Sequence, residues 1–266
     1  MQKRGEAARN QIKRTMLSYL LFHKNCSFSE LGKVVDASRV TLYSLADELC
    51  ASGIIRRDGE RKLELDKSNT FVFLKFYDDI AEICFVRLGE APSRTRLPFV
   101  PSMSREENIA RIASIAERYV SELGFPVNAV LVNFADTFGA LLPKTFSRSF
   151  DARDCVGDGF DNEMAVGTVL YIDGAGEVSV LCNDRKCIGC GKFVTDNIFH
   201  SLENLFYLCA PKFLLAKGIK TEILNEIEKM CRSAGVRLLA LSEEQLSPDE
   251  VAAILSVCDE KIMRLK

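Results

Sequence analysis

Apolar residues recur at helical spacing through the first fifty residues of the chain. In residues 6–24, apolar residues at helical spacing would form one face of a helix and basic residues the other, which predicts an amphipathic helix. A shorter helix is predicted over residues 29–35. A third is predicted over residues 39–51, because Ser38 is a favourable N-terminal cap and Gly53 follows the last turn. The segment is therefore expected to contain three helices, with a tight turn between the second and the third.

A β-hairpin is predicted directly after these helices. Residues 54–57 and 60–65 flank the pair Asp58-Gly59, and the second of these segments alternates apolar with charged positions. Asp-Gly between two such segments is typical of a two-residue hairpin turn. Three helices followed by a hairpin is the element order of a winged helix-turn-helix.

The exposed positions of this segment are candidates for contact with double-stranded DNA. Once Leu42, Leu45 and Leu49 are assigned to the core, the N-terminal half of the third helix presents side chains that could enter a major groove. The hairpin, or wing, adds four cations for the DNA backbone. The candidate DNA-binding residues are Arg39, Val40, Thr41, Tyr43, Ser44, Arg56, Arg57, Arg61 and Lys62.

Charge is distributed unevenly between the two parts of the chain. The net charge of the whole chain is -2, but residues 1–66 contain 12 Lys and Arg against 9 Asp and Glu. Lys3, Arg4, Arg9, Lys13 and Arg14 begin the chain as a basic arm that we expect to neutralise phosphates. The alternative is a purely structural subdomain with a solvated, charged hairpin.

From residue 67 onward the pattern predicts strands that alternate with longer helices. This is the signature of an α/β domain over residues 67–266. Hairpins are expected at 71–88 and 168–181. Further strands are expected at 129–134, 213–216 and 236–241, and helices at 105–123, 192–209, 221–233 and from 248 onward.

Several classes of protein are excluded by composition. No window has the roughly 18–20 consecutive apolar residues of a membrane span, and the charged start Met1–Glu6 lacks the apolar core of a secretory signal. The 10 cysteines lie mostly in apolar segments, which is typical of reduced, buried thiols. We therefore expect a cytoplasmic protein without a disulfide framework.

Three segments resemble the ROK family of repressors and sugar kinases, in its repressor form. Residues 37–55 are similar to the recognition helix and the start of the wing, and residues 62–88 to the junction with the first strands of an actin-like, ribonuclease H-like domain. Residues 204–218 are similar to the helix, proline and strand that open the last part of that domain. The resemblance implies a winged helix over residues 1–66 and an actin-like domain over residues 67–266.

The residues that this family uses for phosphoryl transfer have no clear counterpart here. The turn at Tyr77-Asp78-Asp79 lacks the glycine that lets a backbone approach nucleotide phosphates. The pair Asp161-Asn162 reverses the order that the family uses for its catalytic base, and the sugar-binding Glu-x-Gly-His segment is missing. The resemblance therefore implies a shortened, degenerate body without enzyme activity and without a cofactor.

Two smaller motifs leave alternatives open. Cys182, Cys187 and Cys190 could be an eroded zinc site, a redox-sensitive cluster or ordinary thiols in a loop, because no second cysteine pair accompanies them. No metal site is assigned. Gly174 and Gly176 form a lone Gly-x-Gly at a hairpin tip, which serves the turn itself and is a weak nucleotide signal.

The sequence thus predicts a transcriptional regulator, most simply a repressor, that binds DNA as a homodimer and responds to an unidentified small-molecule effector. The alternatives are a small sugar kinase or other nucleotide-binding enzyme of the actin-like fold, and a protein-interaction module whose winged helix no longer contacts DNA.

Overall fold

The computed structural model describes residues 2–23, 25–59, 62–77, 79–124, 127–132, 148–149, 169–172, 177–181, 187–192, 198–242 and 244–263. The chain forms two compact units, one of residues 1–152 and 253–266 and the other of residues 153–252. The N-terminal helices thus belong to the same unit as the sheet that follows them. The proposed domain boundary after residue 66 stays a prediction.

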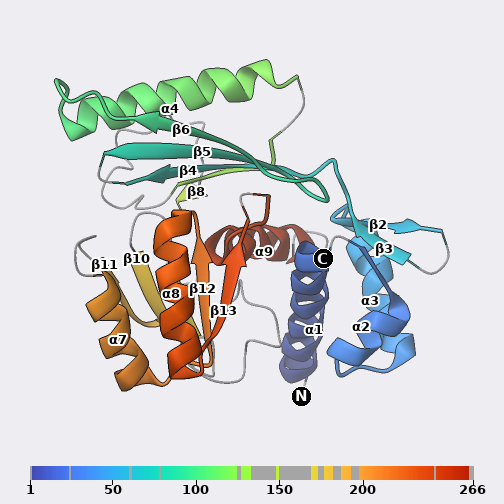
Figure 1. The fold of residues 1–266 in the computed structure, drawn as a ribbon. Coiled ribbons are helices and arrows are strands. Elements are labelled where there is room, and N and C mark those ends of the chain that lie inside the picture. Colours follow the sequence, from blue (N-terminus) through green and yellow to red (C-terminus); the bar gives the residue numbers. More distant parts are fainter. Residues whose placement is uncertain are drawn as a thin grey trace. The chain divides into compact units, whose positions relative to one another are not determined.

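The N-terminal segment contains the three predicted helices and the predicted hairpin (Figure 1). The strands β2 and β3 pair antiparallel, and β1, which the sequence pattern did not reveal, pairs with the other edge of β3. The sheet order is therefore β1-β3-β2. The elements are α1 Gln2–His23, β1 Asn25–Ser27, α2 Phe28–Val34, α3 Arg39–Ala51, β2 Ile55–Asp58 and β3 Lys62–Leu65.

Local signals fix where these elements begin and end. Ser27 and Glu30 form a capping box at the start of α2, and the Ser38 hydroxyl accepts a hydrogen bond from the Thr41 amide at the start of α3. Gly53 and Gly59 have positive φ angles of 67° and 68°, which glycine adopts without a steric penalty. They end α3 and turn the hairpin, respectively.

The N-terminal core is built from the faces that the hydrophobic spacing indicates. The large apolar side chains that are at most 1% exposed are those of Met16, Leu17, Leu20, Leu31, Leu42, Leu45, Leu49, Ile54, Ile55 and Leu63. Each of them contributes about 1.5–3 kcal/mol to stability, because its apolar surface is removed from water.

A five-stranded sheet follows in the same unit, with the order β6-β5-β4-β7-β8. Antiparallel pairing joins β4, β5 and β6, whereas β7 is parallel to β4 and β8 is parallel to β7. One face packs against α4, whose Ile109 and Ile112 are fully buried among sheet residues. The elements are β4 Thr70–Phe76, β5 Ile80–Arg87, β6 Ser93–Pro98, α4 Arg105–Glu122, β7 Ala129–Val132 and β8 Arg148–Ser149.

The second unit repeats this topology, with the order β11-β10-β9-β12-β13. Again three strands are antiparallel and two further strands are parallel to the first. Side chains of α7 and α8, among them Leu202 and Ile227, pack on one sheet face. The elements are β9 Val169–Ile172, β10 Glu177–Leu181, β11 Cys187–Lys192, α7 Ile198–Cys209, β12 Phe213–Lys217, α8 Thr221–Ala234 and β13 Arg237–Leu241. The last helix, α9 Pro248–Met263, begins in this unit, and its residues from 253 onward belong to the first unit.

The α/β class predicted for the body is confirmed. The hairpins β4–β5 and β9–β10 and the helices α4, α8 and α9 occur where the pattern predicts them, whereas α7 begins at Ile198, later than the expected start near residue 192, which belongs to β11. One element was interpreted wrongly: residues 187–190 belong to strand β11, which pairs with β10, and not to a loop. The pattern of Cys187-Ile188-Gly189-Cys190-Gly191 lacks the apolar alternation by which a strand is recognised.

Candidate nucleic-acid interface

The N-terminal half of α3 has an exposed face, as expected from its spacing. Val40 is 80% exposed and Tyr43 42% exposed, and Arg39 and Ser44 are also exposed. The Arg39 side chain makes no hydrogen bond or ion pair within the described ranges. Thr41, which we expected to be exposed, is half-buried, and its hydroxyl lies 2.8 Å from that of Ser38. Thr41 therefore also belongs to the helix cap.

The cations of the wing differ in their surroundings. Arg56 forms an ion pair of 2.6 Å with Glu64 on the neighbouring strand β3. Arg57 forms one of 2.5 Å with Asp47 on α3. Lys62 is exposed and makes no ion pair with a described residue. Arg61 lies outside the described residues.

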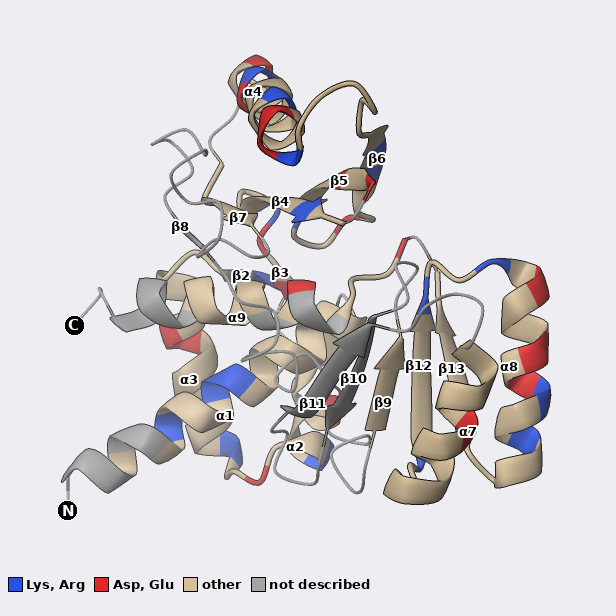
Figure 2. Ribbon diagram, turned by 90° about the vertical axis from the view of Figure 1, so that its left-hand side faces the viewer, with Lys and Arg blue, Asp and Glu red and all other residues tan. Residues whose placement is uncertain are grey.

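Two basic residues of α1, Arg9 and Lys13, form ion pairs within the protein. Arg9 pairs with Glu48 of α3, and Lys13, only 3% exposed, pairs with the same carboxylate at 2.5 Å. Burial raises the pKa of Glu48, but hydrogen bonds and charge from Lys13 and Arg9 outweigh it and hold the pKa below its ordinary value. Figure 2 shows basic positions along α1. Arg9 and Lys13 thus join α1 to α3, in contrast to the phosphate contact expected from the sequence.

The motifs considered for phosphoryl transfer lie largely outside the described residues. The turn between β4 and β5 is closed by a 2.8 Å hydrogen bond from the Tyr77 amide to the Ile80 carbonyl, but Asp78 itself is not described. Asp161-Asn162, Gly174 and Gly176 also lie outside the described ranges, as does Cys182. Among the residues that are described, no group of three potential metal ligands occurs.

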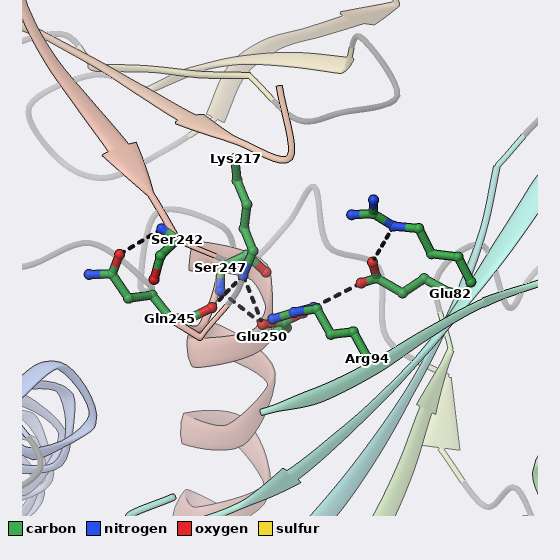
Figure 3. A network of polar contacts seen from close by, with 8 residues as sticks. Glu82, Arg94, Lys217, Ser242, Gln245, Ser247 and Glu250 are labelled. Atoms are coloured by element: carbon green, nitrogen blue, oxygen red, sulfur yellow. Dashed lines mark hydrogen bonds and ion pairs between the residues drawn. The ribbon is translucent and has the colours of Figure 1, made fainter. Parts of the chain in front are cut away.

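Two buried polar networks occur in the body, one in each unit (Figure 3). In the first, Glu82 on β5 accepts hydrogen bonds from Arg94 at 2.8 Å and Arg96 at 3.2 Å, both on β6. In the second, the Lys217 ammonium donates to the Gln245 carbonyl and lies 3.8 Å from Glu250, which is fully buried.

No described helix is long and apolar enough to span a bilayer.

No family model and no curated protein matches the chain. Several solved structures match it. A ROK family transcriptional regulator, a homolog of the Escherichia coli MLC protein, matches with 10% identity and a TM-score of 0.54, covering 97% of this chain and 98% of that one.

Two further matches are more distant. A Bacteroides thetaiotaomicron protein with an actin-like ATPase fold and unknown function has 7% identity and a TM-score of 0.49, covering 71% of this chain and 96% of its own. A Thermus thermophilus ROK hexokinase has 10% identity and a TM-score of 0.35, and the match covers 74% of this chain and 100% of the hexokinase chain. At these identities the likeness concerns the fold alone. The chain therefore shares its fold with the ROK family transcriptional regulator that it matches.

Proposed function

We propose that this protein is a DNA-binding transcriptional regulator, with residues 1–66 as a winged helix that reads DNA through α3. The observation that carries the proposal is the exposed N-terminal half of α3, where Arg39 has no ionic partner in the described ranges and Val40 is 80% exposed. An arginine fork suits the acceptor edge of guanine, and an apolar side chain suits the thymine methyl group.

The charge distribution supports this proposal. Residues 1–66 carry a net charge of +3 and the remaining residues one of -5, so that the N-terminal segment is attracted to a polyanion and the body is not. Part of the positive charge is compensated within the protein by Glu48, Glu64 and Asp47. We therefore expect modest non-specific affinity, and a specific affinity that depends on α3.

We further propose that the protein acts as a homodimer, because one winged helix contacts too few base pairs to select a single site among many competitors. On α7, Phe199, Tyr207 and Leu208 are 38%, 88% and 75% exposed, which is unusual for large apolar side chains and favours this helix as a contact between copies. Sedimentation equilibrium of the full chain is expected to give the mass of a dimer, and Leu208→Asp to lower it.

The body is proposed to be a non-catalytic sensor and not a kinase. The turn between β4 and β5 contains no glycine, so its side chains oppose a close approach of nucleotide phosphates. A tightly bound ligand raises the melting temperature of its protein. We expect ATP, with or without hexoses, to leave the melting temperature unchanged, and a clear rise accompanied by sugar phosphate formation would favour the enzyme.

The test of the main proposal is selection of genomic DNA fragments by the full chain at low salt, followed by affinity measurements on the enriched sequence and on a scrambled one. We expect enrichment of a common sequence that contains a symmetric pair of half-sites, with affinity falling steeply as salt rises. No detectable binding to any fragment at low salt would rule out a regulator that acts through DNA.

A further inference from the structure

Arg57 extends from the wing across one face of α3. Tyr43, Asp47 and Cys50 follow each other at helical spacing on that face. The Arg57 guanidinium is 2.5 Å from the Asp47 carboxylate and 6.0 Å from the centre of the Tyr43 ring. Burial raises the pKa of the Cys50 thiol, and the charge and hydrogen bond of Arg57 offset part of this effect. Arg57 thus contacts about two turns of α3.

An aromatic pair completes the surroundings of this guanidinium. Phe28, at the start of α2, stacks on Tyr43 with ring centres 4.0 Å apart and an angle of 21° between the planes. The Arg57 guanidinium lies 5.7 Å from the centre of the Phe28 ring. A cation over aromatic faces is attracted by their π electrons. One side chain of β2 therefore joins β2 to both α2 and α3.

The neighbouring cation Arg56 provides the contrast. It is paired with Glu64 directly opposite on β3, so its ionic contact stays within the wing. Its side chain is 51% exposed, compared with 35% for Arg57. Of the described wing cations, Arg57 is the one whose ion pair connects the wing with the helix that we propose to read DNA.

We propose that Arg57 is a positioning residue: it fixes the wing to α2 and α3 and orients Tyr43 for base contact, and it does not bind a DNA phosphate. This rests on the proposed function. A phosphate would compete with Asp47 and with both rings for the guanidinium. While Arg57 stays in place it also neutralises Asp47, which is 68% exposed and would otherwise repel the DNA backbone.

Substitution by lysine separates the two roles. Lysine keeps the charge, which suffices for a phosphate, but it lacks the planar fork that pairs with a carboxylate while stacking on rings. For Arg57→Lys and Arg57→Gln alike we expect the ratio of specific to non-specific affinity to fall about 10-fold. The matched controls are Arg56→Lys and Arg56→Gln, which should change specific and non-specific affinity by the same factor and so leave their ratio close to that of the unchanged protein.

The salt dependence of binding gives an independent reading on the same full-length variants. Loss of one phosphate contact lowers the slope of log affinity against log salt by about 0.9. We expect the slopes of Arg57→Gln and the unchanged protein to agree. Wild-type specificity in Arg57→Lys, together with a slope lowered by about 0.9 in Arg57→Gln, would overturn the proposal and make Arg57 a phosphate ligand.

Hydrogen exchange in the free protein keeps this test separate from that of the proposed function. If Arg57 fixes the wing, Arg57→Lys should accelerate exchange of the β2 and α3 amides, whereas Arg56→Lys should leave α3 unchanged. Unaltered exchange in Arg57→Lys would also overturn the proposal. If neither the unchanged protein nor any variant bound DNA, the proposed regulator function would be refuted. The exchange data would still decide whether Arg57 holds the wing.

Discussion

Replacing Glu48 by glutamine should loosen α1 from α3. The Glu48 carboxylate is 40% exposed and is shared by two cations of α1, namely Arg9, with 45% of its side chain exposed, and Lys13, with 4%. Glutamine keeps the shape of the side chain and removes its charge. The ammonium of Lys13 would then remain in a buried position without a carboxylate.

The magnitude follows from these exposures. An exposed ion pair such as that of Arg9 contributes about 0.5 kcal/mol. Replacing the charged partner of the buried Lys13 ammonium by a neutral amide costs about 1–3 kcal/mol. The sum is about 1.5–3.5 kcal/mol, and a value of about 2 kcal/mol corresponds to a roughly 30-fold larger equilibrium constant for local opening.

Amide hydrogen exchange measured by mass spectrometry reports this opening directly. We expect peptides of α1 and α3 to exchange roughly 30-fold faster in Glu48→Gln. The matched control is Glu226→Gln on α8, which removes an exposed ion pair of 2.6 Å with Lys229 and should change exchange little. Equal, small changes in both variants would show that the buried ammonium does not depend on Glu48 and would refute the reasoning.

The same contact predicts an acid sensitivity. The pKa of Glu48 is lower in the folded protein than in the unfolded chain. The stabilising effect of its ion pairs is therefore present at pH values above the ordinary pKa of glutamate, and it is lost as the pH falls through the pKa of the folded state. Three further outcomes are expected. Arg39→Ala should cost about 1–3 kcal/mol of specific binding and relax the preference at one base pair, whereas Lys62→Ala should weaken all sequences alike and lower the salt slope. Cys26 and Cys231 should react slowly with iodoacetamide at pH 8 in the folded protein, since burial raises their pKa values to about 12 and about 11. Because these values exceed those of free thiols, folding stability should decrease as the pH rises above about 9, which alkaline urea titrations would measure.

Much of the N-terminal fold could be predicted from sequence because its signals are local. The cap at Ser38, the glycine after α3 and the Asp-Gly turn each determine an end of an element. Strands β1 and β6 could not be predicted this way. The first has only three residues. The second, Ser93–Pro98, is an edge strand with mostly polar side chains and no apolar alternation, and it is held as a strand by its pairing with β5.

For the candidate interface, sequence spacing predicted which side chains of α3 are exposed but not what the cations contact. The partners Lys13 and Glu48 are far apart in sequence, as are Arg57 and Phe28, and such contacts arise only when the helices pack. Counting charges therefore overestimated the number of cations available to DNA. The exposed acidic residue Asp47 could have suggested an internal partner, because an isolated carboxylate opposes DNA binding on a helix that contacts DNA.

The central claim is that α3 contacts DNA, and photo-crosslinking tests it most directly. A benzophenone amino acid would replace Val40 in one full-length variant and Met103, just before α4, in another, since these side chains are 80% and 41% exposed and Met103 belongs to neither the proposed DNA contact nor the proposed dimer contact. With the enriched duplex bound at low salt, we predict a DNA adduct from position 40 and none from position 103. An adduct from position 103 but none from position 40, on protein that binds the duplex, would contradict the account.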